Sequence, residues 1–215
     1  MDFDDAKERL ITELRLEGIK DEKVLEAFSK IPRHLFVPEE MVNEAYLNIA
    51  LPVGHGQTIS QPYTIAVMLE ALELKGEDKV LEVGTGSGYN AALISYLIGR
   101  KGKLFTTEIV PELAEQSRKK LAGLGLKNVK VVIADGSLGY AKERPYDAVI
   151  VTAACREVPP HLLKQLKSNG ILVAPVGRLY EQEMLKIRKV KGKLDVKNLG
   201  FFVFVPLKGA FEPVT

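Results

Sequence analysis

The stretch from Val80 to Ser95 constrains the fold more than any other part of the chain. It begins with an apolar run that contains one acid, Glu82, and such a run is typical of a buried strand in a parallel sheet. Glycines at alternate positions over 84–88 then force a tight turn, and the apolar spacing of a helix resumes at Tyr89. The stretch therefore predicts a strand, a glycine loop and a helix.

The spacing of this loop favours one class of ligand. Its glycines let the backbone approach a ligand without an intervening Cβ, and the helix start directs free N–H groups toward it. The third glycine comes too early for the dinucleotide fingerprint G-x-G-x-x-G, and no Walker sequence G-K-[ST] follows. The loop resembles motif I of the S-adenosylmethionine-dependent methyltransferases and predicts a nucleotide-type ligand. The alternative is a sharp turn that binds nothing.

The length and charge of the chain predict one soluble domain that does not bind a polyanion. The 215 residues carry a formal net charge of +2 with both signs interspersed, so neither nucleic acid nor a membrane surface is an expected partner. No apolar stretch is long enough to span a bilayer, and residues 1–5 lack the features of a signal peptide. Cys155 is the single cysteine, which excludes an internal disulfide. We expect a cytoplasmic protein and a monomer.

After the glycine loop, predicted strands alternate with predicted helices. Apolar runs predict strands at 103–108, 128–134, 146–152 and 171–176, with a helix opening at Pro111 after the first of them. A repeating βα pattern of this kind predicts an α/β fold, a Rossmann-like, doubly wound, mainly parallel sheet.

The two ends of the chain differ from this pattern. Residues 1–50 predict a helical extension, with helices over 3–16 and 21–29 and prolines breaking the chain thereafter. Residues 183–190 and 196–205 flank a Gly-containing turn and predict two antiparallel strands at the edge of the sheet.

Polar and small residues stand where the predicted strands end. Glu108 ends a strand about twenty residues beyond the loop, the position from which an acid accepts hydrogen bonds from a ribose. The alternative is an acid at the start of the helix that Pro111 opens. At the next two strand ends, Asp135 is placed to accept from an exocyclic amine, Gly136 allows close approach, and Thr152 is small enough to line a pocket.

Glu82 precedes the glycine loop and has two readings. In an S-adenosylmethionine site its carboxylate would receive the amine of the amino-acid part of the ligand. As a buried strand acid it would instead accept hydrogen bonds from backbone N–H groups.

The segment from Leu51 to Tyr63 shows neither strand nor helix periodicity and predicts a loop. Ser60 or Gln61 would form the N-cap of a helix that starts at Pro62. Capping does not explain Gly54, Gly56, Gln57 and Thr58, whose bare backbone, amide and hydroxyl together suit contacts with a ligand.

At this point the resemblance to one family becomes specific. The chain resembles the protein-L-isoaspartate O-methyltransferases along nearly its whole length. The motifs that carry this resemblance are Ile31-Pro32-Arg33, Phe36-Val37-Pro38, Leu51-Pro52, Gly54-His55-Gly56-Gln57-Thr58-Ile59-Ser60-Gln61-Pro62, Glu82 to Tyr89, Asp135-Gly136 and Phe204-Val205-Pro206-Leu207. His55 departs from the smaller or different residue of many relatives, which bears on peptide preference and not on the reaction.

The resemblance implies a reaction and a set of roles. S-adenosyl-L-methionine would donate a methyl group to the free α-carboxylate of an L-isoaspartyl residue, leaving S-adenosyl-L-homocysteine, and the ester would cyclise to a succinimide that reopens partly to aspartate. The partners would be isoaspartyl-containing proteins and peptides, and no metal would be needed. Ser60 would be the active-site residue. Cofactor contacts are expected from Glu82, Gly84, Thr85, Gly86, Ser87, Gly88, Glu108, Ile109, Asp135, Gly136 and Thr152, and substrate contacts from Gly54, His55, Gln57, Thr58, Ile59, Val205, Pro206 and Leu207.

The predicted organisation is one methyltransferase domain, residues 1–215. Within it we expect the helical extension at 1–50, a substrate and active-site loop at 51–63, the cofactor-binding core at 79–176 and the antiparallel tail strands at 183–207. An ionised carboxylate needs no base to attack the sulfonium methyl, so Ser60 is expected to position the substrate and not to act as a nucleophile.

Two rival functions share the cofactor motif. A nucleic-acid methyltransferase would usually carry an (Asn/Asp)-Pro-Pro-(Tyr/Phe) motif after the fourth strand, where this chain has Val151-Thr152-Ala153-Ala154. A binding module without catalysis would bind the cofactor and transfer nothing. Of the remaining reactive side chains, Cys155 is expected to be a buried thiol and His34 a hydrogen-bonded group, not a metal ligand.

Overall fold

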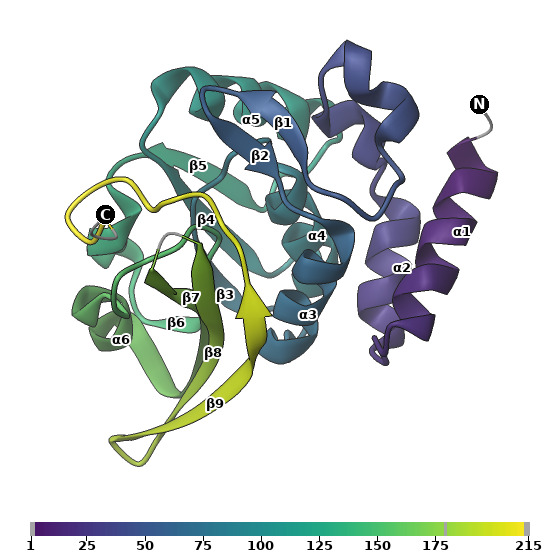
Figure 1. The fold of residues 1–215 in the computed structure, drawn as a ribbon. Coiled ribbons are helices and arrows are strands. Elements are labelled where there is room, and N and C mark those ends of the chain that lie inside the picture. The colour runs from purple at the N-terminus through teal and green to yellow at the C-terminus, as the bar shows by residue number, and fades with distance from the viewer. Residues whose placement is uncertain (1–2, 179, 213–215) are drawn as a thin grey trace.

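The computed structural model describes residues 3–178 and 180–212, so the first two residues of the predicted N-terminal extension lie outside the described part. The main sheet has the strand order β5-β4-β3-β6-β7-β8-β9 (Figure 1). Its strands are β3 Lys79–Val83, β4 Lys103–Glu108, β5 Val129–Ile133, β6 Tyr146–Val151, β7 Leu166–Arg178, β8 Glu181–Val190 and β9 Lys193–Phe202. The α-helices are α1 Phe3–Leu16, α2 Glu22–Lys30, α3 Pro62–Leu72, α4 Tyr89–Ile98, α5 Pro111–Gly123 and α6 Pro160–Gln165.

The pairing confirms the predicted α/β class. Strands β5, β4, β3, β6 and β7 run parallel, and β8 and β9 add an antiparallel edge. The chain proceeds outward from β3 through β4 to β5 and then returns to β6 on the other side of β3. The chain therefore continues from β3 toward one edge of the sheet and from β6 toward the other. Open α/β sheets bind their ligands at the carboxyl ends of two such strands.

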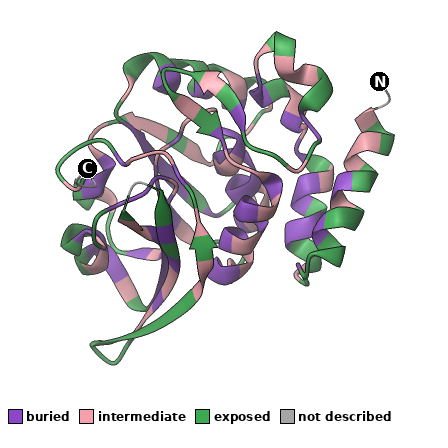
Figure 2. Cartoon of the chain, viewed as in Figure 1, coloured by how far each residue is buried: buried purple, intermediate pink, exposed green. Residues whose placement is uncertain are grey.

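Alternating side chains bury both faces of the sheet. On one face, Val80 and Ala148 belong to the large apolar cluster that includes buried residues of α1 to α5. On the other face, Leu81 and Val149 pack in a second cluster with Leu162 of α6. The central strands are buried accordingly, as their colour in Figure 2 shows. The connection from β5 to β6 contains only the short 3-10 helices η3 Gly136–Leu138 and η4 Ala141–Glu143.

The helical extension forms as predicted. Asp21 caps α2, since its carboxylate accepts from the N–H groups of Lys23 and Val24. Two 3-10 helices, η1 Arg33–Phe36 and η2 Glu39–Glu44, then lead toward the main body. None of the described helices is long and apolar enough to cross a membrane.

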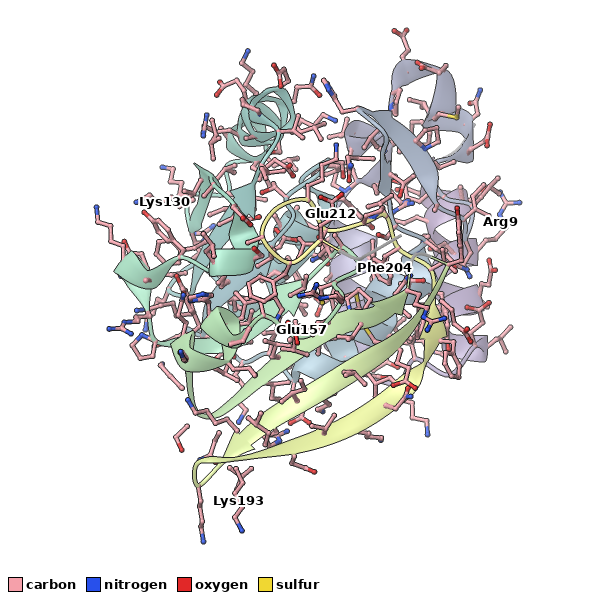
Figure 3. The ribbon with its side chains drawn as sticks, turned by 60° about the vertical axis from the view of Figure 1, so that its left-hand side comes forward. Arg9, Lys130, Glu157, Lys193, Phe204 and Glu212 are labelled. Atoms are coloured by element: carbon pink, nitrogen blue, oxygen red, sulfur yellow. The ribbon has the colours of Figure 1, made fainter. Side chains whose placement is uncertain are left out.

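The structure corrects three expectations. The strand predicted over 171–176 is longer, because β7 runs over Leu166–Arg178. Leu51–Tyr63 is not an irregular loop, because β1 Leu51–Gly54 and β2 Gln57–Ile59 pair antiparallel in a separate two-stranded sheet. Its strands are too short to show an alternating apolar pattern. The last strand also differs from the predicted 196–205: β9 begins at Lys193, at the exposed tip of the β8–β9 hairpin (Figure 3), and ends at Phe202.

Candidate active site

The site begins where β3 and β6 end side by side. The Thr152 hydroxyl donates hydrogen bonds to the carbonyl oxygens of Val83 at 3.0 Å and Gly84 at 2.7 Å. Gly84 has a φ of +97°, and a Cβ added there would lie 2.5 Å from the Thr152 Oγ1. Both its backbone angle and its close approach to Thr152 therefore require glycine at this position.

The glycine loop is held by the neighbouring strand. The N–H groups of Gly84 and Thr85 both donate to the carbonyl oxygen of Thr107, at 2.9 and 3.1 Å. The N–H of Gly86 donates to the Glu108 carboxylate at 2.8 Å. Gly88 is the N-cap of α4, at a φ of +89°. These contacts fix the loop across the carboxyl end of β4.

Glu108 joins this loop to the next helix. One carboxylate oxygen accepts from Gly86, and the other accepts from the N–H of Val110, the N-cap of α5, at 3.0 Å. The side chain is 6% exposed and lines the cavity. It therefore meets the geometric needs of both readings, a ligand for ribose and a helix N-terminal acid. Its contact with ribose stays a prediction.

Glu82 lies behind the loop and does not line the cavity. Its buried carboxylate accepts from the Asn90 amide at 2.7 Å and from the Thr106 hydroxyl at 2.5 Å. Burial raises its pKa to about 7, against the opposing effect of these two hydrogen bonds. The partners are thus side chains and not the backbone N–H groups of the alternative reading. A direct contact between Glu82 and the cofactor stays a prediction.

Asn90 contacts Glu82 on one side and the cavity on the other. Its Oδ1 is buried and accepts no hydrogen bond from any described residue. A buried acceptor without a partner costs free energy, and a ligand amine in this cavity would supply the missing donor. Asn90 is not among the site residues predicted from the sequence. Its place in the first turn of α4, directly after the glycine loop, is the signal that indicates it.

At the end of β5 the two predicted residues have separate surroundings. Gly136 lines the cavity, and an added Cβ would lie 2.3 Å from the Thr107 Oγ1. The Asp135 carboxylate instead accepts from the N–H and hydroxyl of Ser137 and, at 3.0 Å, from the N–H of Ala210 in the C-terminal segment. Asp135 does not line the cavity, and its contact with an exocyclic amine stays a prediction.

Ser60 lies between the β1–β2 hairpin and α3. Its carbonyl oxygen accepts from the Arg33 guanidinium at 3.0 Å, while its hydroxyl has no hydrogen-bond partner among the described residues. The residues that line the cavity within the described chain include no histidine. Because no base contacts the hydroxyl, the geometry suits a hydrogen-bond donor and not an activated nucleophile.

The C-terminal segment forms the opposite wall. The N–H of Ala154 donates to Val205 at 2.8 Å, and the N–H of Leu207 donates back to Ala154 at 2.7 Å. This segment runs from the end of β9 across the ends of the central strands, where Figure 3 labels Phe204 and Glu212. Residues of this segment therefore line the cavity, although they are distant from the glycine loop in sequence.

Most of the predicted site residues line one cavity. These are Gln57, Thr58, Ile59, Ser60, Gly84, Thr85, Gly86, Ser87, Glu108, Ile109, Gly136, Thr152, Val205, Pro206 and Leu207. Glu82, Gly88, Asp135, Gly54 and His55 do not line it; the last two are exposed at the end of β1 and in the hairpin turn that follows. The lining also includes Ile65, Met68, Asn90 and Lys208, which the sequence analysis did not name. No described residues form a group of three or more His, Cys, Asp or Glu able to hold a metal.

A groove adjoins this cavity at Thr58, Ser60 and Val205, which line both. It has a volume of about 540 Å³. Its other walls come from residues 48–50 and 201–204, and its apolar side chains Phe201 and Val203 are 64% and 72% exposed. Exposed apolar side chains gathered along one groove are typical of a surface that binds a partner.

Comparison with known proteins agrees with this geometry. The family model "Protein-L-isoaspartate(D-aspartate) O-methyltransferase (PCMT)" matches residues 5–212. Protein-L-isoaspartate O-methyltransferase 2 of Archaeoglobus fulgidus is 48% identical over 98% of this chain and 96% of its own length. The protein-L-isoaspartate O-methyltransferase of Ignicoccus hospitalis is 50% identical over 95% of this chain and 98% of its own length.

Solved structures show the same fold. A protein-L-isoaspartate O-methyltransferase structure superposes with a TM-score of 0.88 at 30% identity, over 95% of this chain and 67% of that one. A Plasmodium falciparum structure assigned to the same enzyme, in complex with S-adenosyl-L-homocysteine, superposes with a TM-score of 0.81 at 25% identity, over 93% of this chain and 97% of that one. The chain belongs to the protein-L-isoaspartate(D-aspartate) O-methyltransferase family.

Proposed function

We propose that this protein methylates the free α-carboxylate of L-isoaspartyl residues in damaged proteins and peptides, with S-adenosyl-L-methionine as donor. The ester would cyclise to a succinimide that reopens partly to aspartate, so the reaction begins a repair. One observation carries this proposal within the family: the Ser60 hydroxyl, which has no hydrogen-bond partner among the described residues, lies where the cavity meets the groove. A methyl donor in the cavity and a peptide in the groove would therefore meet at the Ser60 hydroxyl.

The cavity suits the donor in several respects. Gly84 and Gly136 leave no room for a Cβ, Glu108 presents a buried carboxylate, and the buried Asn90 Oδ1 accepts no hydrogen bond from the described residues. When bound, S-adenosyl-L-methionine supplies an electrophilic sulfonium methyl group. Asn90 would hold its amino-acid part, and Glu108 its ribose.

The substrate carboxylate needs orientation more than activation. A carboxylate with an ordinary pKa is ionised at neutral pH, so no residue has to remove a proton before it attacks. Ser60 would donate a hydrogen bond to this carboxylate and hold it in line with the methyl group, and closing the site around it would exclude water. The absence of histidine from the described lining is consistent with this role.

We propose that the groove holds the peptide on either side of the isoaspartyl residue. Thr58, Ser60 and residues 48–50 line one part of it, and residues 201–205, from the end of the edge strand β9 onward, line another. Extended segments of this kind can bind a peptide through main-chain hydrogen bonds, which tolerate varied side chains. In this arrangement Gly54 and His55 would contact only the outer part of a long peptide.

The test is transfer of labelled methyl groups to a peptide pair that differs only in one isoaspartyl or aspartyl linkage. Transfer to the isoaspartyl member alone supports the proposal. Transfer to neither, with cofactor bound, would favour a binding module.

We also propose that the enzyme is cytoplasmic and monomeric. One chain supplies both walls of the site, which supports the monomer, and sedimentation at the working concentration tests it.

A further inference from the structure

Arg33 is a fully buried cation next to the candidate active site. Its side chain is 0% exposed, in η1 of the N-terminal extension. One guanidinium nitrogen, Nη2, donates to the carbonyl oxygens of Ile49 at 3.2 Å and Ser60 at 3.0 Å. The other two, Nε and Nη1, are buried and donate to none of the described residues. Arg33 therefore uses only part of its hydrogen-bonding capacity.

No described carboxylate compensates this charge. Arg33 forms no ion pair in the described part of the chain, and its guanidinium carbon lies 5.1 Å from the centroid of the Tyr89 ring, which gives only a cation–π contact. Burial lowers its pKa to about 10, which still leaves it protonated at neutral pH. An isolated buried charge is costly, so its presence requires an anion elsewhere or a function.

The surroundings of the cavity offer few other cations. Lys208 is the single basic residue in its described lining, and Lys208 is solvent-exposed, so water and salt screen its charge. The Arg33 charge is screened far less, because it lies in the interior and is bonded to the peptide group of Ser60 itself. Its field therefore acts where the hydroxyl of Ser60 meets the groove.

We propose that Arg33 is a positioning residue that acts through Ser60: it fixes the Ser60 main chain and supplies the positive potential that selects an anionic substrate group there. This inference rests on the proposed function, in which that group is the α-carboxylate of isoaspartate. It adds a specificity element from η1, outside the β1–β2 hairpin and the cofactor core. A neutral group in the same place would gain nothing from Arg33.

The experiment measures peptide binding by calorimetry to the full-length protein loaded with S-adenosyl-L-homocysteine. Two ligands are compared: an isoaspartyl peptide, and the same peptide with its α-carboxylate converted to a carboxamide. Arg33→Met should weaken binding of the carboxylate peptide about tenfold or more, because the positive potential at Ser60 would be lost. The affinities for the carboxamide peptide and for S-adenosyl-L-homocysteine should each change by less than about twofold. Arg33→Lys, which keeps the charge, should recover most of the lost affinity.

Arg33→Gln is a second neutral variant in case the methionine variant does not fold, and it should show the same selective loss. Phe28→Leu is the matched control, because Phe28 is an uncharged side chain buried against the same Tyr89 ring, so it tests plain destabilisation without a change of charge. Equal losses for both peptides, or no loss in either neutral variant, would overturn the proposal. If the wild type binds isoaspartyl and aspartyl peptides alike, it is the proposed function that fails.

Discussion

The Thr152 hydroxyl donates a 2.7 Å hydrogen bond to the carbonyl oxygen of Gly84, which fixes the start of the glycine loop against the end of β6. The two residues directly follow β3 and β6, the neighbouring strands between which the order of strand addition reverses. The position of the loop therefore depends on a contact between segments that are distant in sequence.

Gly84→Ala should damage this contact. The new Cβ would lie 2.5 Å from the Thr152 Oγ1 at a φ of +97°, so the loop must shift. We expect a loss of about 1–3 kcal/mol in the free energy of unfolding and a weaker cofactor complex. Thermal melts and cofactor titration measure both. Gly123→Ala, where nothing lies within 4 Å, is the control and should leave binding intact.

Ser60→Ala should lower turnover of an isoaspartyl peptide much more than it weakens the cofactor. Its hydroxyl has no hydrogen-bond partner in the part of the chain that the structure describes, and Ser60 lines both the cavity and the groove. We expect a loss of about 1–2 kcal/mol in transition-state stabilisation from one hydrogen bond. Steady-state kinetics and cofactor titration separate the two effects. Parallel losses would place Ser60 in the cofactor site.

Glu108→Ala should weaken cofactor binding by roughly 1.5–3 kcal/mol, because charge-assisted hydrogen bonds to ribose would be lost. Loss of its bonds to Gly86 and Val110 would also loosen the loop. Glu108→Gln is the informative companion, since its amide oxygen can still accept one of these bonds. A cofactor dissociation constant unchanged in both variants would leave Glu108 with only its role at the start of α5.

Phe201→Ser should raise the KM for peptide several-fold, about 1 kcal/mol for a partly buried aromatic contact, and leave the cofactor dissociation constant unchanged. Phe201 is 64% exposed in the groove near Ser60. Val196→Ser is the control, because Val196 is 53% exposed on the same strand and does not line the groove. A similar rise in KM for both variants would contradict the proposed peptide path.

Glu82 should make stability depend on pH. Burial raises its pKa from 4.5 to about 7, so between these values the folded protein binds more protons than the unfolded chain. The free energy of unfolding therefore falls as pH rises through this window, by roughly 3 kcal/mol in total, and the effect is absent at lower pH and complete above it. Glu82→Gln should remove this part of the curve. Denaturant titrations from pH 4 to 8 on both proteins test it, and parallel curves would refute it.

Local sequence determined the core of the fold. Glycine spacing after a buried strand predicted the turn into α4, and Pro111 predicted the start of α5, because these signals act through backbone angles and a missing N–H. The β4 range, Lys103–Glu108, also agrees with its apolar run. Such features need no knowledge of distant residues.

Tertiary structure decided the partners of the polar side chains. The Asp135 carboxylate accepts a hydrogen bond from the Ala210 N–H, and Arg33 donates one to the Ser60 carbonyl oxygen. Neither sequence position indicates its partner. The β1–β2 hairpin escaped prediction for a related reason, since its strands are too short for a periodic pattern. Periodicity reports which face of an element is buried. The hydrogen-bond partners of a buried polar group depend instead on which remote segments packing brings within about 3 Å of it.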